Sequence, residues 1–155
     1  MKLRVVALGH RMPAWVTAGW DDYARRLPRE FALELTALKP EPRDRGKPVP
    51  QLLAAEAARI TAACKGARVV ALDERGQPWT TRTLADHLAR WRDEARDAAF
   101  VIGSADGLAG SVKRDATAVV ALSALTLPHG LVRVLVAEQL YRAVSLLSGH
   151  PYHRE

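Results

Sequence analysis

Cysteine is nearly absent from this chain of 155 residues, which contains Cys64 alone. A single thiol excludes an internal disulfide and any zinc site built from several thiolates. Long apolar runs are missing too, because the opening MKLRVVALG is short and no stretch reaches the roughly 20 apolar residues of a bilayer span. We therefore expect a protein of a reducing compartment, cytoplasmic and not attached to a membrane.

Common nucleotide-binding and metal-binding signatures are also missing. The stretch IGSADGL at 102–108 contains glycines but lacks the spacing of the dinucleotide fingerprint, and no Gly-rich loop ends in Lys-Ser or Lys-Thr. The histidines have no third ligand at metal spacing, so we expect no metal site. These absences argue against nicotinamide, nucleoside-triphosphate and metal chemistry.

Charge, by contrast, is abundant and uneven. The net charge is +6, and the first 66 residues carry 12 Lys and Arg against 7 Asp and Glu. A basic surface of this kind attracts phosphate backbones, although the same residues can simply keep a surface soluble. Hydrophobic residues make up 48% of the chain. That is enough for one domain to bury a core without covalent staples.

Apolar runs alternate with segments of helical period along the whole chain. The expected strands are 3–9, 31–39, 67–73, 98–103 and 118–123, and the expected helices are 13–27, 50–65, 81–96, 108–116 and 130–147. Three of the strand runs are almost continuously apolar, as in strands covered on both faces. The alternation predicts a single α/β domain over 1–155 with a mostly parallel sheet. The proline-rich, charged segment 39–50 is expected to be a mobile surface connection.

The last expected helix, GLVRVLVAEQLYRAVSLLSG, is apolar nearly all the way round. A helix without a clear polar face is usually covered on several sides. In a chain this small, a second subunit can supply that cover, so we predict a homodimer that uses this helix. Burial inside one subunit is the alternative.

Polar side chains follow the third and fifth strands, where a parallel sheet binds its ligands. Asp73 and Glu74 are either a catalytic carboxylate pair or solvated and capping groups. His129 begins the last helix and can cap it or meet a ligand. His10 and His87 are isolated and are expected to be structural.

The chain ends on LSGHPYHRE, which has more polar and titratable side chains than most chain ends. Two histidines, a tyrosine and an arginine stand within its last six residues. These side chains donate protons and bind anions, so the tail is predicted to belong to an active site.

Three motifs in order, FVIGSADGL, LSALTLPHGLVRVLVAEQLYRA and HPYHRE, closely resemble the bacterial rRNA large subunit methyltransferase H family of the SPOUT superfamily. The resemblance runs end to end and is most specific in the last third. It implies S-adenosylmethionine (SAM) as methyl donor, a homodimer, and a C-terminal deep trefoil knot that binds SAM within roughly 67–155. Members methylate N3 of pseudouridine 1915 of 23S rRNA on the assembled 70S ribosome. One departure is visible, because the family commonly reads Gly-Gly where this chain has Gly103-Ser104.

The resemblance also implies which residues form the site. Those placed against SAM are Leu72, Gly103, Leu122, Ser123, Ala124, Leu125, Thr126 and Leu127. Those placed in catalysis are His129, Tyr152, His153 and Arg154. The N3 proton must leave during transfer, which requires a base or a group that stabilises the developing anion. We expect Arg154 to contact the anion or a phosphate, His129 or His153 to handle the proton, and Tyr152 to stack on the flipped base.

Two other functions compete with this interpretation. One is a different SPOUT activity, such as ribose 2'-O methylation of tRNA, which would share the cofactor fold but gives no reason for the histidine-rich tail. The other is a non-catalytic dimer that binds the ribosome. Nucleoside mass spectrometry separates the first from the predicted reaction, and SAM titration separates the second.

Overall fold

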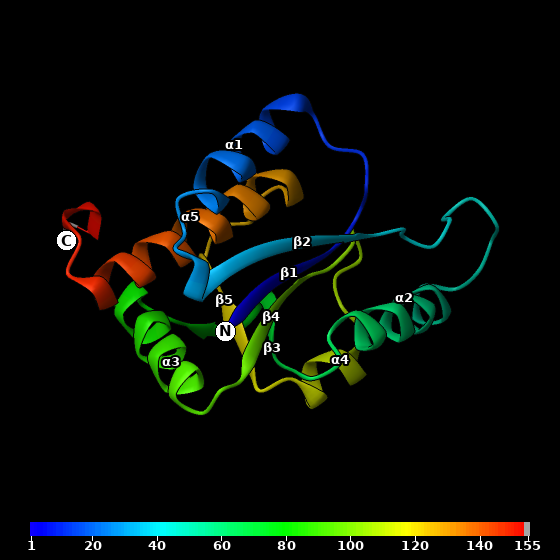
Figure 1. The fold of residues 1–155 in the computed structure, drawn as a ribbon. Coiled ribbons are helices and arrows are strands. Elements are labelled where there is room, and N and C mark those ends of the chain that lie inside the picture. The colour runs from blue at the N-terminus through cyan, green and yellow to red at the C-terminus, as the bar shows by residue number, and fades with distance from the viewer. Residues whose placement is uncertain (154–155) are drawn as a thin grey trace.

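The structure, a computed structural model, describes residues 1–153, and of His153 only the backbone. Within these residues five parallel strands form one sheet, in the order β2-β1-β4-β3-β5 (Figure 1). The strands are β1 (Lys2–Leu8), β2 (Ala32–Leu38), β3 (Ala67–Pro78), β4 (Asp97–Ile102) and β5 (Ala118–Ala121). Each lies within a few residues of its predicted run. The predicted single α/β domain with a parallel sheet is confirmed.

Five α-helices connect the described strands and follow the predicted segments. They are α1 (Ala14–Ala24), α2 (Val49–Ala63), α3 (Thr81–Asp93), α4 (Gly110–Asp115) and α5 (His129–Ser148). Short 3-10 turns lie at Arg29–Phe31 and Pro151–His153. Figure 1 shows α1, α3 and α5 on one face of the sheet and α2 and α4 on the other.

Two apolar cores, one on each face, follow from the alternation of side chains along the strands. In β1, Val5 points into the core under α1, α3 and α5, where it joins Phe100 and Leu140. The next residue, Val6, points into the core under α2 and α4 with Ile60. Both faces of the central strands are therefore covered, which explains why their sequences are continuously apolar.

Strand β3 runs five residues past its predicted end at 73. Its register with β5 shifts between Leu72 and Gln77, so the intervening residues bulge out of the ladder. Gly76 makes this possible, because a Cβ there would lie 2.7 Å from the backbone of Val119. The bulge places Asp73 and Glu74 at the carboxyl edge of the sheet.

Helix α5 lies between α1 and α3 and ends at Gly149. Gly149 has φ +69°, a left-handed conformation, and His150 N–H closes the end by donating to Ser145 O at 3.0 Å. Because the chain then turns back on α5, Tyr152 contacts Tyr141, with 4.5 Å between ring centroids.

Residues 1–153 contain neither a membrane-spanning helix nor a metal cluster. None of the helices described there is long and apolar enough to cross a membrane. That part of the chain also contains no group of three His, Cys, Asp or Glu side chains able to hold a metal ion. The trefoil knot stays a prediction.

Candidate active site

An open cleft of about 810 Å³ lies at the carboxyl edge of the sheet, beyond β1, β3 and β4. Seven of the eight residues predicted to bind SAM line it: Leu72, Gly103, Leu122, Ser123, Leu125, Thr126 and Leu127. His129 lines it as well. Ala124, the eighth, is exposed in the same loop but does not line the cleft. We call this space the strand-end cleft.

One wall of the strand-end cleft is apolar and open to solvent. Leu125 is 75% exposed and Leu122 is 39% exposed, whereas most large apolar side chains of the chain are covered. Leu72 and Leu127 continue the same wall. Exposed apolar side chains gathered around a cleft are typical of a surface that a ligand or a partner covers.

The rim near β3 carries the two acids that the sequence singled out. Asp73 accepts from Lys113 Nζ at 3.4 Å and from the backbone N–H of Arg75 at 2.9 Å. Glu74 accepts from the hydroxyl of Thr126 at 3.3 Å. Each acid therefore holds a neighbouring segment in place, and the two do not form a carboxylate pair. This arrangement favours the structural alternative for both.

His129 is held at both ring nitrogens. Nδ1 lies 3.0 Å from the carbonyl oxygen of Gly103, and Arg133 Nε lies 3.2 Å from Nε2. A carbonyl only accepts and an arginine only donates, so the consistent tautomer carries its proton on Nδ1. His129 thereby ties the start of α5 to the end of β4.

This environment favours the neutral imidazole of His129. Burial lowers its pKa most, the charge of Arg133 lowers it further, and the bond to Gly103 opposes both. One of the two hydrogen bonds would have to open before the ring could take up a proton. The predicted proton-handling role of His129 stays a prediction, and the geometry gives the ring a positioning role.

Arg133 is a buried charged group beside His129 on α5. Its side chain is 2% exposed, and burial lowers its pKa. It donates to His129 and to the carbonyl oxygen of Gly9, and no carboxylate pairs with it within residues 1–153. Gly9 has φ +132° and sits where a Cβ would come within 3.3 Å of the guanidinium. Arg133 therefore fixes the loop after β1 to the same helix end.

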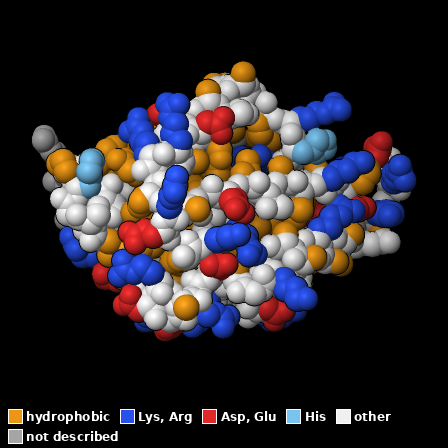
Figure 2. All heavy atoms as spheres, in the orientation of Figure 1, with side chains coloured by type: hydrophobic (Ala, Val, Ile, Leu, Met, Phe, Trp, Pro, Cys, Tyr) orange, Lys and Arg blue, Asp and Glu red, His pale blue; other side chains and the backbone are white. Residues whose placement is uncertain are grey.

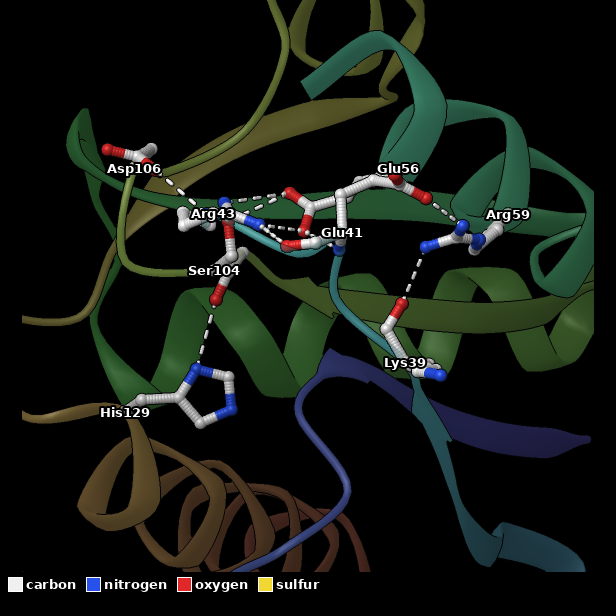
Figure 3. Close-up of polar contacts among 9 residues, drawn as sticks. Lys39, Glu41, Arg43, Glu56, Arg59, Ser104, Asp106 and His129 are labelled. Atoms are coloured by element: carbon white, nitrogen blue, oxygen red, sulfur yellow. Dashed lines mark hydrogen bonds and ion pairs between the residues drawn. The ribbon is translucent and has the colours of Figure 1, made fainter. Parts of the chain in front are cut away.

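Sequence reasoning missed a second cluster, centred on the carboxylate of Glu56 (Figure 3). Glu56 is 2% exposed on α2, and Arg43 from the 39–50 segment donates to it at 2.8 and 3.3 Å. Ser104 donates to it at 2.9 Å and accepts from Arg43 at 2.7 Å. The expectation that segment 39–50 is merely a mobile connection therefore does not fit its base, which is anchored beside the cleft.

Glu56 remains ionised in this cluster. Burial raises its pKa, but hydrogen bonds from Arg43, the backbone N–H of Glu41 and Ser104 outweigh burial and hold the pKa below its usual range. The pKa of Arg43 is raised mainly by its bonds to Glu56. Ser104 is thus more than a tolerated departure from glycine, because its hydroxyl bridges the two charges.

His10 and His87, which were expected to be structural, lie outside the strand-end cleft. His87 stacks on Trp79 with 4.2 Å between ring centroids, in keeping with a structural role. His10 is exposed in the loop after β1.

Tyr152 lies outside the strand-end cleft, where it packs against the middle of α5. Its hydroxyl donates to Glu138 Oε1 at 3.0 Å, and Arg142 lies 4.9 Å from its ring centroid. Burial and the bond to Glu138 raise its pKa. Glu138 is nine residues along α5 from His129, about 14 Å along the helix axis, and Tyr152 does not line the cleft of its own chain. The side chain of His153 and all of Arg154 lie outside the described residues.

Comparison with known proteins decides the family. The model described as "Predicted SPOUT methyltransferase" matches residues 1–153. A protein of Nitrosospira multiformis named "Ribosomal RNA large subunit methyltransferase H" is 57% identical over 155 residues, 99% of each chain. A protein of Burkholderia mallei with the same name is 56% identical over the same share. The chain belongs to the rRNA large subunit methyltransferase H family of SPOUT methyltransferases.

Solved structures agree with the SPOUT methyltransferase fold. A "Probable Methyltransferase" of Bordetella pertussis superposes with a TM-score of 0.61 at 20% identity, covering 92% of this chain and 95% of that one. A "probable methylase family protein" of Haemophilus influenzae superposes with a TM-score of 0.57 at 14% identity, covering 99% and 70%. The family resemblance noted from the motifs is confirmed, and the protein is a methyltransferase.

Proposed function

We propose that this methyltransferase uses SAM to methylate N3 of a pseudouridine in 23S rRNA on the assembled ribosome. The observation that carries the proposal is the strand-end cleft, where seven residues predicted from the family motifs come together. The curated relatives are named as rRNA large subunit enzymes, which supports rRNA as the substrate. We extend the family's pseudouridine preference to this chain through its terminal HPYHRE motif.

The chemistry of the cleft residues fits SAM. Leu72, Leu122 and Leu127 offer apolar walls to an adenine ring, and backbone groups from Ser123 to Thr126 offer donors and acceptors to its edge. When bound, SAM supplies an activated methyl group on a sulfonium. His129 and Arg133 then act by holding the Gly103 carbonyl and the neighbouring loops in one arrangement.

The acceptor must lose its N3 proton, and the tail carries the groups suited to this step. A guanidinium at Arg154 would stabilise the developing negative charge, and His153 would take the proton. Tyr152 presents an aromatic face for the flipped base. Because Tyr152 does not line the cleft of its own chain and is bonded to Glu138 on α5, we propose that the tail of one subunit completes the cleft of its partner.

A homodimer is therefore part of the proposal. Helix α5 keeps half-buried apolar residues, including Leu131 and Leu135, and Trp15 on α1 is 56% exposed. A second copy covering α1 and α5 would bury these side chains. The SAM-binding part is expected to occupy roughly 67–155 and to be knotted, as in the family.

The test uses purified protein, SAM carrying a labelled methyl group, and 70S ribosomes from a strain that lacks this modification. Nucleoside mass spectrometry should then find the label on N3 of one pseudouridine. Label on a ribose hydroxyl would support the tRNA-type alternative if tRNA were also the better substrate. Absence of SAM binding by calorimetry at millimolar ligand would favour a non-catalytic ribosome-binding dimer.

Ribosomes and an isolated rRNA hairpin should differ sharply as substrates. The chain is a single small domain with a modest excess of basic residues, so electrostatics alone give weak, salt-sensitive binding to RNA. We expect the shape of the ribosome to supply the register. Equal methylation of the free hairpin would contradict this part of the proposal.

A further inference from the structure

Two loops leave the sheet side by side at the carboxyl edge. Strands β1 and β2 pair in parallel as far as Leu8 and Leu38, and the N–H of Gly9 donates to Leu38 O at 2.7 Å. The loop after β1 therefore starts beside the segment after β2. We call residues 39–48 the basic arm. Figure 1 shows this segment projecting from the end of the sheet before α2 begins.

Exposed cations gather on the basic arm and the loop beside it. Lys39, Arg45 and Lys47 belong to the arm, and Arg11 belongs to the neighbouring loop. Figure 2 shows several Lys and Arg side chains at this end of the molecule. Asp44 supplies the single carboxylate among the exposed residues 44–48, against the two cations of Arg45 and Lys47.

The cations of the arm and of the neighbouring loop have no carboxylate partner among the described residues. Within residues 1–153 no carboxylate pairs with Arg11, Lys39, Arg45 or Lys47. Several basic residues elsewhere are neutralised locally: Arg25 and Arg26 pair with Asp22, and Arg68 pairs with Glu94. Unpaired, exposed cations remain available to an anionic partner.

The base of the arm is fixed, although its sequence is rich in proline. All five N–H groups of Arg43 are used, by Asp106, the Glu41 carbonyl, both oxygens of Glu56 and the hydroxyl of Ser104. Arg59 donates to the Lys39 carbonyl and to the Glu41 carboxylate (Figure 3). Arg43 therefore anchors the base of the arm, and the exposed residues 44–48, which form its tip, remain free to contact a partner. An arm held in advance loses less conformational entropy on binding.

We propose that the basic arm, with Arg11, binds the phosphate backbone of rRNA that flanks the target base. The inference rests on the proposed function, because it takes rRNA as the substrate. Flexible exposed cations without carboxylate partners suit phosphates, whereas reading a base requires fixed side-chain geometry. The arm therefore contributes affinity and orientation but not base identity. Pro40, Glu41 and Arg43 at its base line the strand-end cleft, so RNA held by the tip lies beside the reaction.

The test is the double variant Arg45→Ala/Lys47→Ala, whose side chains are exposed and support no contact of the fold. Methylation of 70S ribosomes is measured at several salt concentrations, together with SAM affinity by calorimetry. We expect KM for ribosomes to rise several-fold, with kcat and SAM affinity unchanged. The slope of log KM against log salt should fall by about 1.5, since each lost phosphate contact removes roughly 0.7 to 0.9.

Two matched variants control for charge. Lys65→Ala/Arg96→Ala removes two exposed, unpaired cations that precede β3 and β4, at the opposite edge of the sheet, and should leave KM and slope unchanged. Arg45→Lys/Lys47→Arg keeps the charge and should behave like the natural chain. Equal effects of the two alanine pairs, or an unchanged KM for the arm variant, would overturn the proposal.

Crosslinking identifies the partner directly. After ultraviolet irradiation of the enzyme on ribosomes, mass spectrometry should find nucleotides attached to peptides from the basic arm. Crosslinks from the arm to a ribosomal protein instead would overturn the assignment to RNA. None of these outcomes contradicts the proposed function. The proposed function fails separately, if the natural chain does not methylate ribosomes.

Discussion

The hydroxyl of Tyr152 donates to Glu138 Oε1 at 3.0 Å, which fastens the start of the terminal tail to the middle of α5. His129 stands at the start of the same helix, in the strand-end cleft. Tyr152 does not line the cleft of its own chain, which is why we propose that it serves the cleft of a partner subunit.

Deleting residues 150–155 should reduce methyl transfer by roughly 100-fold to 10,000-fold, the usual contribution of acid/base groups. Folding, dimerisation and SAM binding should change little, because the described residues of this segment add little to the core: His150 and Pro151 are exposed and Tyr152 is half-buried. Turnover on ribosomes, light scattering and calorimetry measure the three properties. Near-normal turnover would contradict a catalytic tail.

Mixed dimers test whether the site is shared. Tail-deleted subunits are combined with subunits in which Leu125→Asp disables the cleft wall, after each has been shown to be inactive alone. Heterodimers should regain one working site if tail and cleft come from different chains. Failure to recover activity, with heterodimers demonstrated by mass spectrometry, would place both parts in one chain.

Ser104→Ala should lower the free energy of unfolding by about 1 to 2 kcal/mol, because the hydroxyl bridges Glu56 and Arg43 and both partners are charged. A chain of this size should then melt a few degrees lower. Ser104→Thr keeps the hydroxyl and is the control. Thermal unfolding followed by circular dichroism measures both, and an unchanged melting temperature for the alanine variant would show that the bridge contributes nothing.

Acid should destabilise the protein partly through His129. The folded state lowers the pKa of this ring, so the unfolded chain binds more protons once the pH falls through the ordinary imidazole value of about 6.5. Its stabilising contribution is present above that value and is lost below it. His129→Gln should be less stable at neutral pH but lose less stability on acidification, measured by urea unfolding across this range. If both proteins lost the same free energy of unfolding on acidification, the claim that His129 is neutral in the folded state would be contradicted.

Cys64 should resist thiol reagents in the folded protein. Burial raises the pKa of this thiol to about 11, and the nearby charge of Arg4 offsets only part of the effect. Near pH 8 the thiolate fraction should be roughly 100-fold below that of a free cysteine, so reaction with Ellman's reagent should be slow and speed up about tenfold per pH unit. Unfolding in guanidinium should abolish the protection.

The strands and helices could be predicted because their signals are local. Val5 and Val6 belong to an apolar run that is buried on both faces of the sheet. Gly149 ends a long helix in the left-handed conformation, which glycine adopts more readily than other residues. The extension of β3 was missed because it depends on a register shift against β5. Only the close approach of Val119 to Gly76 explains that shift, and β5 is more than 40 residues further along the chain.

The site was predicted mainly where motifs identify it. Leu72, Gly103 and the loop that starts at Leu122 were assigned from the family resemblance, and the fold gathers them at one cleft. The Glu56 cluster gave no signal, since a glutamate in a helix is ordinarily solvated. Its burial depends on Arg43 and on Ser104, which are 13 and 48 residues away.

The strand order has a consequence for synthesis on the ribosome. Strand β3 is made before β4 but lies beyond it in the sheet, and β1 pairs with β4 at positions about 95 residues apart. Until β4 has emerged, β1 and β2 expose an unpaired apolar edge and β3 has no neighbour to join. Such distant pairing slows folding and leaves the nascent chain open to aggregation. The sheet therefore cannot form until the six residues of β4, about two-thirds of the way along the chain, have been synthesised.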